Sequence, residues 1–220
     1  MTSGLYGVFP GSEANDIQDV PTATEYITTD YIVYNGEEKG LDNVTWVMQA
    51  DIHVYGTLFI NSSHFTWDPS TDGGLEFNIH SGGMLKMKDT NMTANDTTTK
   101  QTNEEDGIWE VSWGIHWKFI FAGSGWIRDS DLSYMWGASA TGIDNIQGGL
   151  QLLNDDIFID NINIFNGQGS GLTLWNPSHS YSSPGAGPTI TNSVVKNASG
   201  DGLFICGYGN KYPTINNTDF

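Results

Sequence analysis

Several residue types are scarce in this 220-residue chain. Cys206 is the single cysteine, so no disulfide can form within the chain and a disulfide-stapled fold is excluded. We expect Cys206 to be a small residue in the core or at a corner rather than a reactive thiol or a metal ligand. Arg128 is the only arginine, and 8 basic residues stand against 26 acidic ones. Nucleic acid is therefore not an expected partner, because phosphate binding needs clustered Lys and Arg, and acidic polysaccharides are disfavoured for the same reason.

Long apolar runs are also missing. No stretch of about 18 apolar residues occurs, so the sequence predicts no transmembrane segment. We expect residues 1–25 to form an N-terminal cap or extension, with one helical turn within residues 11–20, because the exposed end of a repeat array needs a cover. The excess of acidic residues favours solubility, a saline environment or divalent cations between neighbouring molecules.

A short phrase recurs six times along the chain. It has six positions: the first and sixth are apolar, the third is Ser, Asp or Asn, the fourth is usually Ser or Thr, and the second and fifth vary. Successive phrases start 27, 40, 32, 31 and 25 residues apart, and recurrence at about 20–50 residues is typical of repeat architectures. The six copies occupy residues 60–65, 87–92, 127–132, 159–164, 190–195 and 215–220.

The two apolar ends of this phrase predict its conformation. A helical turn cannot bury both ends, whereas a strand that bends at the Ser, Asp or Asn position can point both inward. A second phrase, Gly-Leu-variable-apolar, lies beside it; the glycine is expected to form a tight corner, and the leucine and the residue two positions later to face one side. Each repeat is therefore expected to contain two or three short strands joined by corners. The copies of the second phrase occupy residues 74–77, 149–152, 171–174 and 202–205.

With these phrases the chain resembles the right-handed parallel β-helix superfamily, which is also called pectin-lyase-like, and especially the β-helix repeat proteins of archaeal and bacterial surfaces. The resemblance covers about residues 44–220, within an expected domain of residues 26–220. It implies an all-β fold, a right-handed parallel β-helix solenoid of roughly six to eight rungs with an irregular N-terminal cap. Equivalent positions of successive rungs would then stack about 4.8 Å apart.

Residues 108–121 alternate between apolar and polar side chains with period two, which predicts one strand. Trp109, Trp113 and Trp117 lie on its apolar side. They either belong to the core or form an exposed aromatic platform that stacks sugars or packs against a neighbouring subunit. Surface loops are expected at residues 93–107 and 176–188.

The sequence contains only a fragment of a catalytic apparatus. For family members that hydrolyse polysaccharides, the resemblance implies several aspartates with a Gly-His-Gly and an Arg-x-Lys on one outer face; for lyases it implies calcium-binding aspartates with Arg or Lys. Asp155 and Asp156 resemble one part of the hydrolase set, and paired carboxylates can act as acid and base. No Gly-His-Gly occurs, and Arg128 is followed by Asp129 and Ser130, so no Arg-x-Lys occurs either. No catalytic residue is therefore predicted, and a solvated corner is the alternative for Asp155 and Asp156.

Two histidines align when the first two phrases are superposed. His53 lies three residues before Gly56, and His80 lies three before Gly83, so the histidines are expected to be neighbours on successive rungs. Such a pair suits a metal ion, and the resemblance includes proteins linked to copper delivery. Two ligands alone make a poor site, so a pair of surface histidines is the alternative.

Asp89 and Asp129 occupy the same phrase position in consecutive repeats. Stacked carboxylates repel each other unless a cation lies between them or the adjacent Lys88 and Arg128 supply the opposite charge. Calcium is the one cofactor that this position suggests, and otherwise none is predicted.

Asn-x-Ser/Thr triplets, the acceptor pattern for N-glycosylation, occur somewhat more often than the composition predicts by chance. This mild excess favours an exported glycoprotein. Asn95, in the polar segment, is the best candidate. The six candidate glycosylation sites are Asn43, Asn61, Asn91, Asn95, Asn197 and Asn216.

The expected function is structural: an extracellular protein of a cell-surface layer, sheath or filament that assembles with copies of itself or with other cell-envelope proteins. The alternative is a polysaccharide lyase or hydrolase, or a carbohydrate-binding β-helix, with carbohydrate as partner. Residues 215–220 complete a rung, so we expect either that the polypeptide continues beyond Phe220 or that this end stacks on the N-terminal region of another copy. A head-to-tail contact of this kind propagates into a filament.

Overall fold

All regular secondary structure in the described part of the chain is β-strand. The structure is a computed structural model. It describes residues 23–70, 74–95, 99–103, 109–113, 116–136, 148–167, 169–175, 185–198, 201–206 and 211–220. The expected helical turn at residues 11–20, and nearly all of the expected cap, lie outside these residues. In the described part no helix is long and apolar enough to cross a membrane.

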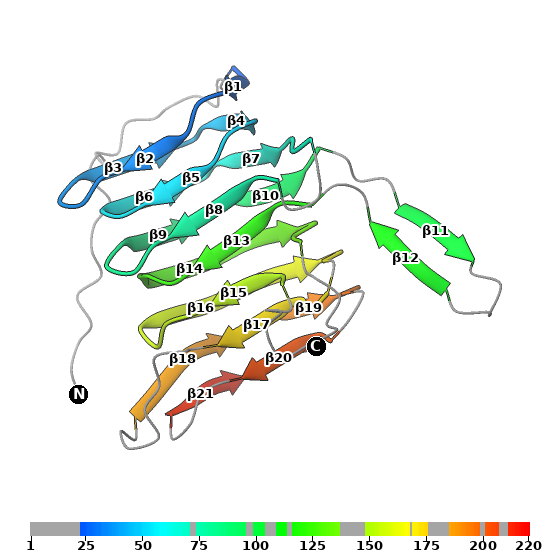
Figure 1. The fold of residues 1–220 in the computed structure, drawn as a ribbon. Coiled ribbons are helices and arrows are strands. Elements are labelled where there is room, and N and C mark those ends of the chain that lie inside the picture. Colours follow the sequence, from blue (N-terminus) through cyan, green and yellow to red (C-terminus); the bar gives the residue numbers. More distant parts are fainter. Residues whose placement is uncertain are drawn as a thin grey trace.

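The strands form three parallel series, which the chain visits in turn (Figure 1). The first series contains β3 (Glu38–Asp42), β6 (Thr57–Asn61), β9 (Met84–Lys88), the first half of β14 (Ser124–Ser133), the first half of β16 (Ile157–Phe165), β18 (Gly185–Thr191) and β21 (Lys211–Asn216). The second contains β1 (Glu25–Ile27), β4 (Thr45–Met48), β7 (His64–Trp67), β10 (Asn91–Ala94), the second halves of β14 and β16, and β19 (Val194–Lys196). The third contains β2 (Tyr31–Val33), β5 (Ile52–Val54), β8 (Glu76–Ile79), β13 (Lys118–Phe121), β15 (Leu150–Leu152), β17 (Leu172–Trp175) and β20 (Leu203–Cys206).

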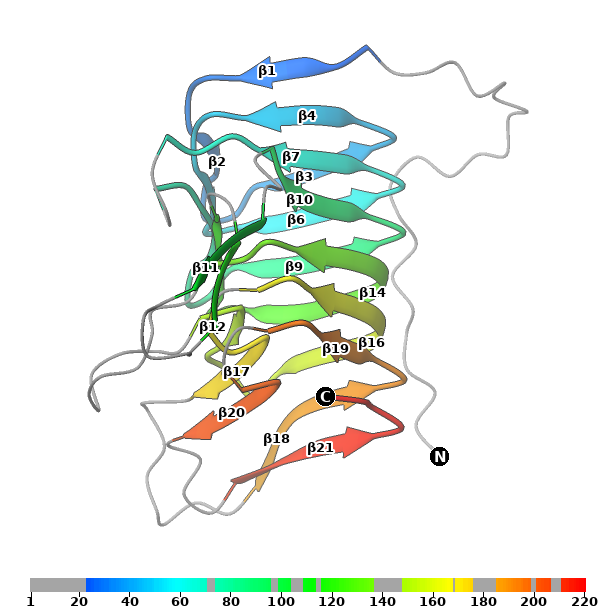
Figure 2. The same ribbon diagram turned by 90° about the vertical axis from the view of Figure 1, so that its right-hand side faces the viewer.

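One passage through the three series is called a coil below. The third series is a 7-stranded sheet, whereas the first two join into one 12-stranded sheet because β14 and β16 run through both. Figure 2 shows the second series from β1 down to β19, each strand beside its counterpart one coil later. The prediction of an all-β, repeat-like architecture with parallel strands is therefore confirmed, with the strands arranged in curled sheets.

The recurring phrases superpose in the structure as their spacing predicts. Ile60 pairs with Met87, and Ile127 pairs with Ile159 one coil later, so the first apolar positions form one continuous row. The last apolar positions form a second row. The first row is Ile60, Met87, Ile127, Ile159, Ile190 and Ile215, and all but Ile215 are fully buried.

A left-handed backbone conformation produces the corner between the first and second series. The third residue of every phrase has positive φ, as Asp129 with φ 48° and Asn161 with φ 52° illustrate. One residue in this conformation breaks the strict alternation of a strand, so the apolar residues on both sides of the corner can point into the core. Asn43, with φ 52°, begins the same corner one coil before the first predicted phrase. The full set is Asn43, Ser62, Asp89, Asp129, Asn161, Asn192 and Asn217.

Buried hydroxyl groups replace missing backbone hydrogen bonds at this corner. The Ser63 hydroxyl donates to the Asn61 carbonyl (2.7 Å) and accepts from the Val44 N–H one coil earlier (3.2 Å). The Ser193 hydroxyl likewise donates to the Thr191 carbonyl (2.7 Å) and accepts from the Ile162 N–H (3.3 Å). Buried backbone groups must be paired, so these hydroxyls explain why Ser or Thr follows the bent residue.

The core lies between the three series and contains stacked aromatic rings. Trp67 and Trp117 are both fully buried, with ring centroids 4.8 Å apart and planes at 7°. Phe77 stacks on Phe119 at 4.7 Å in the same way. The core interpretation is thus confirmed for Trp117; the side chains of Trp109 and Trp113 lie outside the described residues.

The segment between the fourth and fifth strands of the second series differs from the expectation. β11 (Thr99–Asn103) and β12 (Trp109–Trp113) form an antiparallel pair that stands away from the stack in Figure 1. The expected continuous strand over residues 108–121 is wrong, because β12 belongs to this pair and β13 to the third series. The expected loop at 93–107 contains β11, since alternation alone cannot distinguish a hairpin strand from a strand of the stack. Residues 176–184 of the other expected loop are outside the described residues, and residues 185–188 belong to β18.

The second recurring phrase superposes only in part. Leu150, Leu172 and Leu203 pair in register, as predicted. The first copy is out of register by two residues, because Phe77 rather than Leu75 continues the row through Phe119. The glycine has the expected role at Gly149, where an added Cβ would lie 2.2 Å from the Gly171 carbonyl oxygen. Only glycine permits this approach of two backbones.

Candidate functional site

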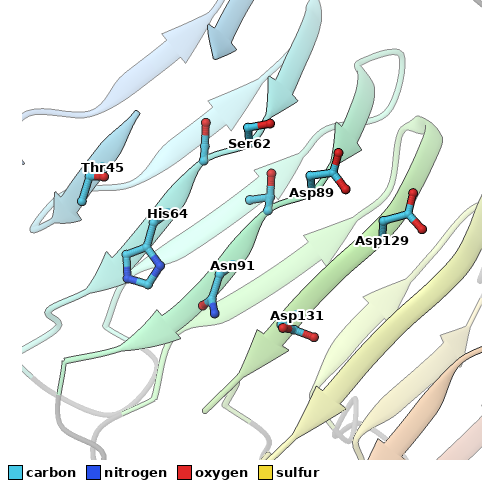
Figure 3. A pocket seen from close by; sticks show the side chains of 9 residues that line it. Thr45, Ser62, His64, Asp89, Asn91, Asp129 and Asp131 are labelled. Atoms are coloured by element: carbon cyan, nitrogen blue, oxygen red, sulfur yellow. The ribbon is translucent and has the colours of Figure 1, made fainter. Parts of the chain in front are cut away.

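A shallow groove follows the corner between the first and second series (Figure 3). Its floor is built from equivalent residues of successive coils, because Thr45 pairs with His64, His64 with Asn91, and Asn91 with Asp131. The lining is polar throughout, unlike the mostly apolar pockets that bind drug-like molecules. It consists of Thr45, Ser62, Ser63, His64, Asp89, Thr90, Asn91, Asp129 and Asp131.

The stacked carboxylates of the groove have a basic partner. The Lys88 ammonium lies 3.3 Å from Asp89 Oδ2 and 3.9 Å from Asp129 Oδ2. Its positive charge therefore offsets the repulsion between the two carboxylates, as expected from the sequence. Arg128 instead lies over the rings of Trp126 and Phe158, with its guanidinium carbon 5.1 and 4.9 Å from their centroids. Of the two expected basic partners, Lys88 bridges the aspartates, and calcium there stays a prediction.

Asparagine amides hold the acidic side chains of the corner in place. Asn161 Nδ2 donates to Asp129 Oδ1 (2.7 Å), and Asn163 Nδ2 donates to Asp131 Oδ1 (2.7 Å). At the next corner the Asn197 amide donates to Asn166 Oδ1 (3.2 Å). Hydrogen bonds of this kind between coils fix the outward side chains in rows.

The two histidines are in contact, as predicted, although the strand register pairs His53 with Asn78, two residues before His80. His53 Nδ1 lies 3.1 Å from His80 Nε2, and the ring centroids are 5.2 Å apart. The Tyr55 ring stacks on His80, with centroids 4.0 Å apart and planes at 8°. This contact fixes the orientation of the His80 imidazole on the outer face of the third series.

Two carboxylates flank His53, and neither was predicted from the sequence. Asp51 Oδ2 lies 3.8 Å from His53 Nε2, and Glu76 Oε1 lies 3.8 Å from His53 Nδ1. The Asn78 amide donates to the same Glu76 oxygen (3.2 Å). A period-two pattern could have found them, because Asp51, His53 and Tyr55 alternate along one coil as Glu76, Asn78 and His80 do along the next.

Burial lowers the pKa of His80 below its ordinary value of 6.5. The proximity of His53 lowers the pKa of His80 further, and Glu76 opposes the shift. The neutral imidazole is therefore favoured, and neutral imidazole is the form that accepts a proton or binds a metal.

Asp155 and Asp156 lie in the turn between β15 and β16. The Asp156 N–H donates to Asn154 Oδ1 (3.2 Å), and the Asp156 carbonyl accepts from the Gly125 N–H (3.0 Å). Asp156 is exposed and Asp155 half-buried. This placement agrees with the corner interpretation of the two aspartates.

The six candidate glycosylation sites differ in how their side chains are bound. Asn61 donates to Asp42 (2.8 Å), and Asn95 donates to Asp68 (2.9 Å). Asn91 and Asn216 are exposed. Glycosylation at any of the six stays a prediction.

Cys206 is exposed at the end of β20, so of the two expected positions, core or corner, the core is wrong. β20 is the last described strand of its series, and no later strand among the described residues covers its final residues. Ile205 beside it is 46% exposed for the same reason.

The sequence matches no family model, and no curated protein and no solved structure is significantly similar to it.

Proposed function

We propose that the chain is a right-handed parallel β-helix of pectin-lyase-like architecture that acts as a structural protein of an extracellular surface layer, sheath or filament. The observation that carries this proposal is the continuous set of rows along the corner. Each coil presents the same edge to the next, with buried hydroxyls and asparagine amides bonded from coil to coil. Such a scaffold is rigid along its axis and can be extended by adding another equivalent edge.

The partner of this scaffold is a second copy of the chain. Among the described residues, the later edges of β20 and β21 pair with no strand, and Tyr212, Ile205 and Phe220 are 70%, 46% and 48% exposed there. The earlier edges of β2 and β3, which belong to the same two series, are likewise unpaired within the described residues. Unpaired parallel edges of matching register are templates for further strands.

Sedimentation velocity over a range of concentrations tests this proposal. We expect larger species as the concentration rises, and a lysine at the β20 edge, Ile205→Lys, should shift the distribution towards monomer. Ile120→Lys, on the outward side of β13 in the middle of the third series, is the matched control and should leave association unchanged. A protein that stays monomeric at every concentration would contradict the proposal.

The groove along the corner favours a second candidate function, carbohydrate binding. Hydroxyl, amide, imidazole and carboxylate groups face it from β4, β7, β10 and β14, and these are groups that bind sugar hydroxyls. A binding screen against neutral and acidic polysaccharides separates this function from a purely structural one. Binding that Asp131→Ala weakens would support it, and release of unsaturated or reducing ends that Asp155→Ala abolishes would establish cleavage instead.

A further inference from the structure

The outer face of the third series places two imidazole nitrogens towards each other. His53 Nδ1 and His80 Nε2 are 3.1 Å apart on adjacent strands. With metal–nitrogen bonds of about 2.05 Å, a separation of 3.1 Å corresponds to a nitrogen–metal–nitrogen angle of about 98°. This angle lies between the square-planar and tetrahedral values, so the separation suits two nitrogens bound to one ion once the rings turn their lone pairs from each other towards it.

Glu76 lies within reach of the same position. Its Oε1 is 3.8 Å from His53 Nδ1 and already accepts a hydrogen bond from the Asn78 amide (3.2 Å). In the described part of the chain, no three His, Cys, Asp or Glu side chains are already arranged around a metal position. A site at this position therefore has the two histidines as direct ligands and needs Glu76 to rotate its side chain before it can bind as the third.

Asp51 and Tyr55 support the ligands from outside. When His53 binds through Nδ1, its proton lies on Nε2, which faces Asp51 Oδ2 at 3.8 Å. A carboxylate this close favours that tautomer by its negative charge and makes the imidazole a better ligand. Tyr55 holds the His80 ring by stacking at 4.0 Å. All of these side chains are partly exposed, so an ion can enter from solvent.

We propose that His53 and His80, with Glu76 as third ligand, form a binding site for a divalent transition metal such as Cu²⁺ or Zn²⁺, with water in the remaining positions. Imidazole nitrogens with one carboxylate suit these ions better than Ca²⁺ or Mg²⁺, which prefer an all-oxygen environment.

Calorimetric titration of the purified chain with Zn²⁺ and with Cu²⁺ at pH 7.5 tests the site. We expect saturable binding of one ion per chain, weakened at least about tenfold by His53→Ala or His80→Ala. Asp51→Asn should weaken binding by about tenfold as well, and this change also weakens the hydrogen bond that Asp51 Oδ1 accepts from the Glu76 N–H (2.8 Å). His64→Ala, which removes a partly exposed histidine from β7 in the groove, is the matched control and should leave the affinity unchanged. His53→Gln and His80→Gln serve if an alanine variant unfolds.

Electron paramagnetic resonance of the Cu²⁺-loaded protein gives an independent result. Two nitrogen ligands should be visible in the chain, and one in either single histidine variant. Absence of saturable binding would overturn the proposal. So would affinity that survives in the His53→Ala/His80→Ala double variant, or that falls equally in His64→Ala.

Discussion

The Ser130 hydroxyl lies one coil after Thr90 and accepts a hydrogen bond from its N–H (3.2 Å) while donating to the Arg128 carbonyl (2.6 Å). Ser130 is 4% exposed, and Thr90 is 2% exposed. Water therefore cannot replace the hydroxyl if it is removed.

Ser130→Ala should lower the free energy of unfolding by about 1–3 kcal/mol, because the buried Thr90 N–H loses its partner. Urea unfolding followed by circular dichroism measures the change. Ser124→Ala, in the same strand but away from the corner, is the control and should change stability by less than about 0.5 kcal/mol. Equal effects of the two substitutions would show that the hydroxyl row does not stabilise the corner.

Asn161 is held in the left-handed conformation, with φ 52°. Asn161→Ala should destabilise the fold by about 1–2 kcal/mol, since alanine adopts this conformation at a cost that asparagine largely avoids. Asn161→Gly should cost clearly less, because glycine adopts positive φ freely. Both variants lose the hydrogen bond to Asp129, so comparison of their urea midpoints isolates the backbone effect. A glycine variant that is no more stable than the alanine variant would contradict the assignment of the corner.

Trp67 and Trp117 form a stacked pair but differ in hydrogen bonding. Trp117 Nε1 donates to the Ser133 carbonyl (2.9 Å), whereas Trp67 Nε1 is buried without a partner among the described residues. Both substitutions to phenylalanine remove the same volume, so Trp117→Phe should destabilise the protein by about 1 kcal/mol more than Trp67→Phe. Thermal unfolding of both variants checks the order, and the reverse order would contradict the core packing described above.

The histidine pair predicts that stability falls in mild acid. The pKa of His80 is lower in the folded state than its ordinary value of 6.5. Below pH 6.5 the unfolded chain binds the proton first, so this contribution is fully present above that pH and is lost as pH falls through the folded pKa.

Urea midpoints at pH 7.5 and 5.5 measure this dependence. His80→Gln should reduce the loss of stability between the two pH values relative to the unmodified protein. A decrease that is identical in the two proteins would assign the acid sensitivity to other groups.

The corner phrase made much of the fold predictable from the sequence. Its third residue must be compatible with positive φ at every coil, and its fourth is Ser or Thr at most of them, so the corner is visible as Ser, Asp or Asn usually followed by Ser or Thr. Ile162 and Val44 occupy the fourth position without a hydroxyl, so positive φ is the requirement that repeats at every coil. The corner at Asn43 was not recognised from the sequence. The antiparallel β11–β12 pair was missed because polar strand residues such as Thr99 carry no apolar pattern.

The histidine contact was predicted from the sequence, but its surroundings were not. Equal spacing from Gly56 and Gly83 placed His53 and His80 on adjacent coils, and the 3.1 Å separation agrees. Spacing from the glycines aligns His53 with His80, whereas the strands pair His53 with Asn78, so this spacing did not point to Asp51 and Glu76. The period-two pattern of each strand would have placed both carboxylates on the histidine face.

Cryo-electron microscopy of the purified protein at high concentration tests the central claim most directly. A scaffold that extends by stacking coils end to end should form rods or filaments whose images show an axial spacing of about 4.8 Å, the distance between neighbouring strands. Only single particles at every concentration, or assemblies without this axial spacing, would contradict the proposed structural function.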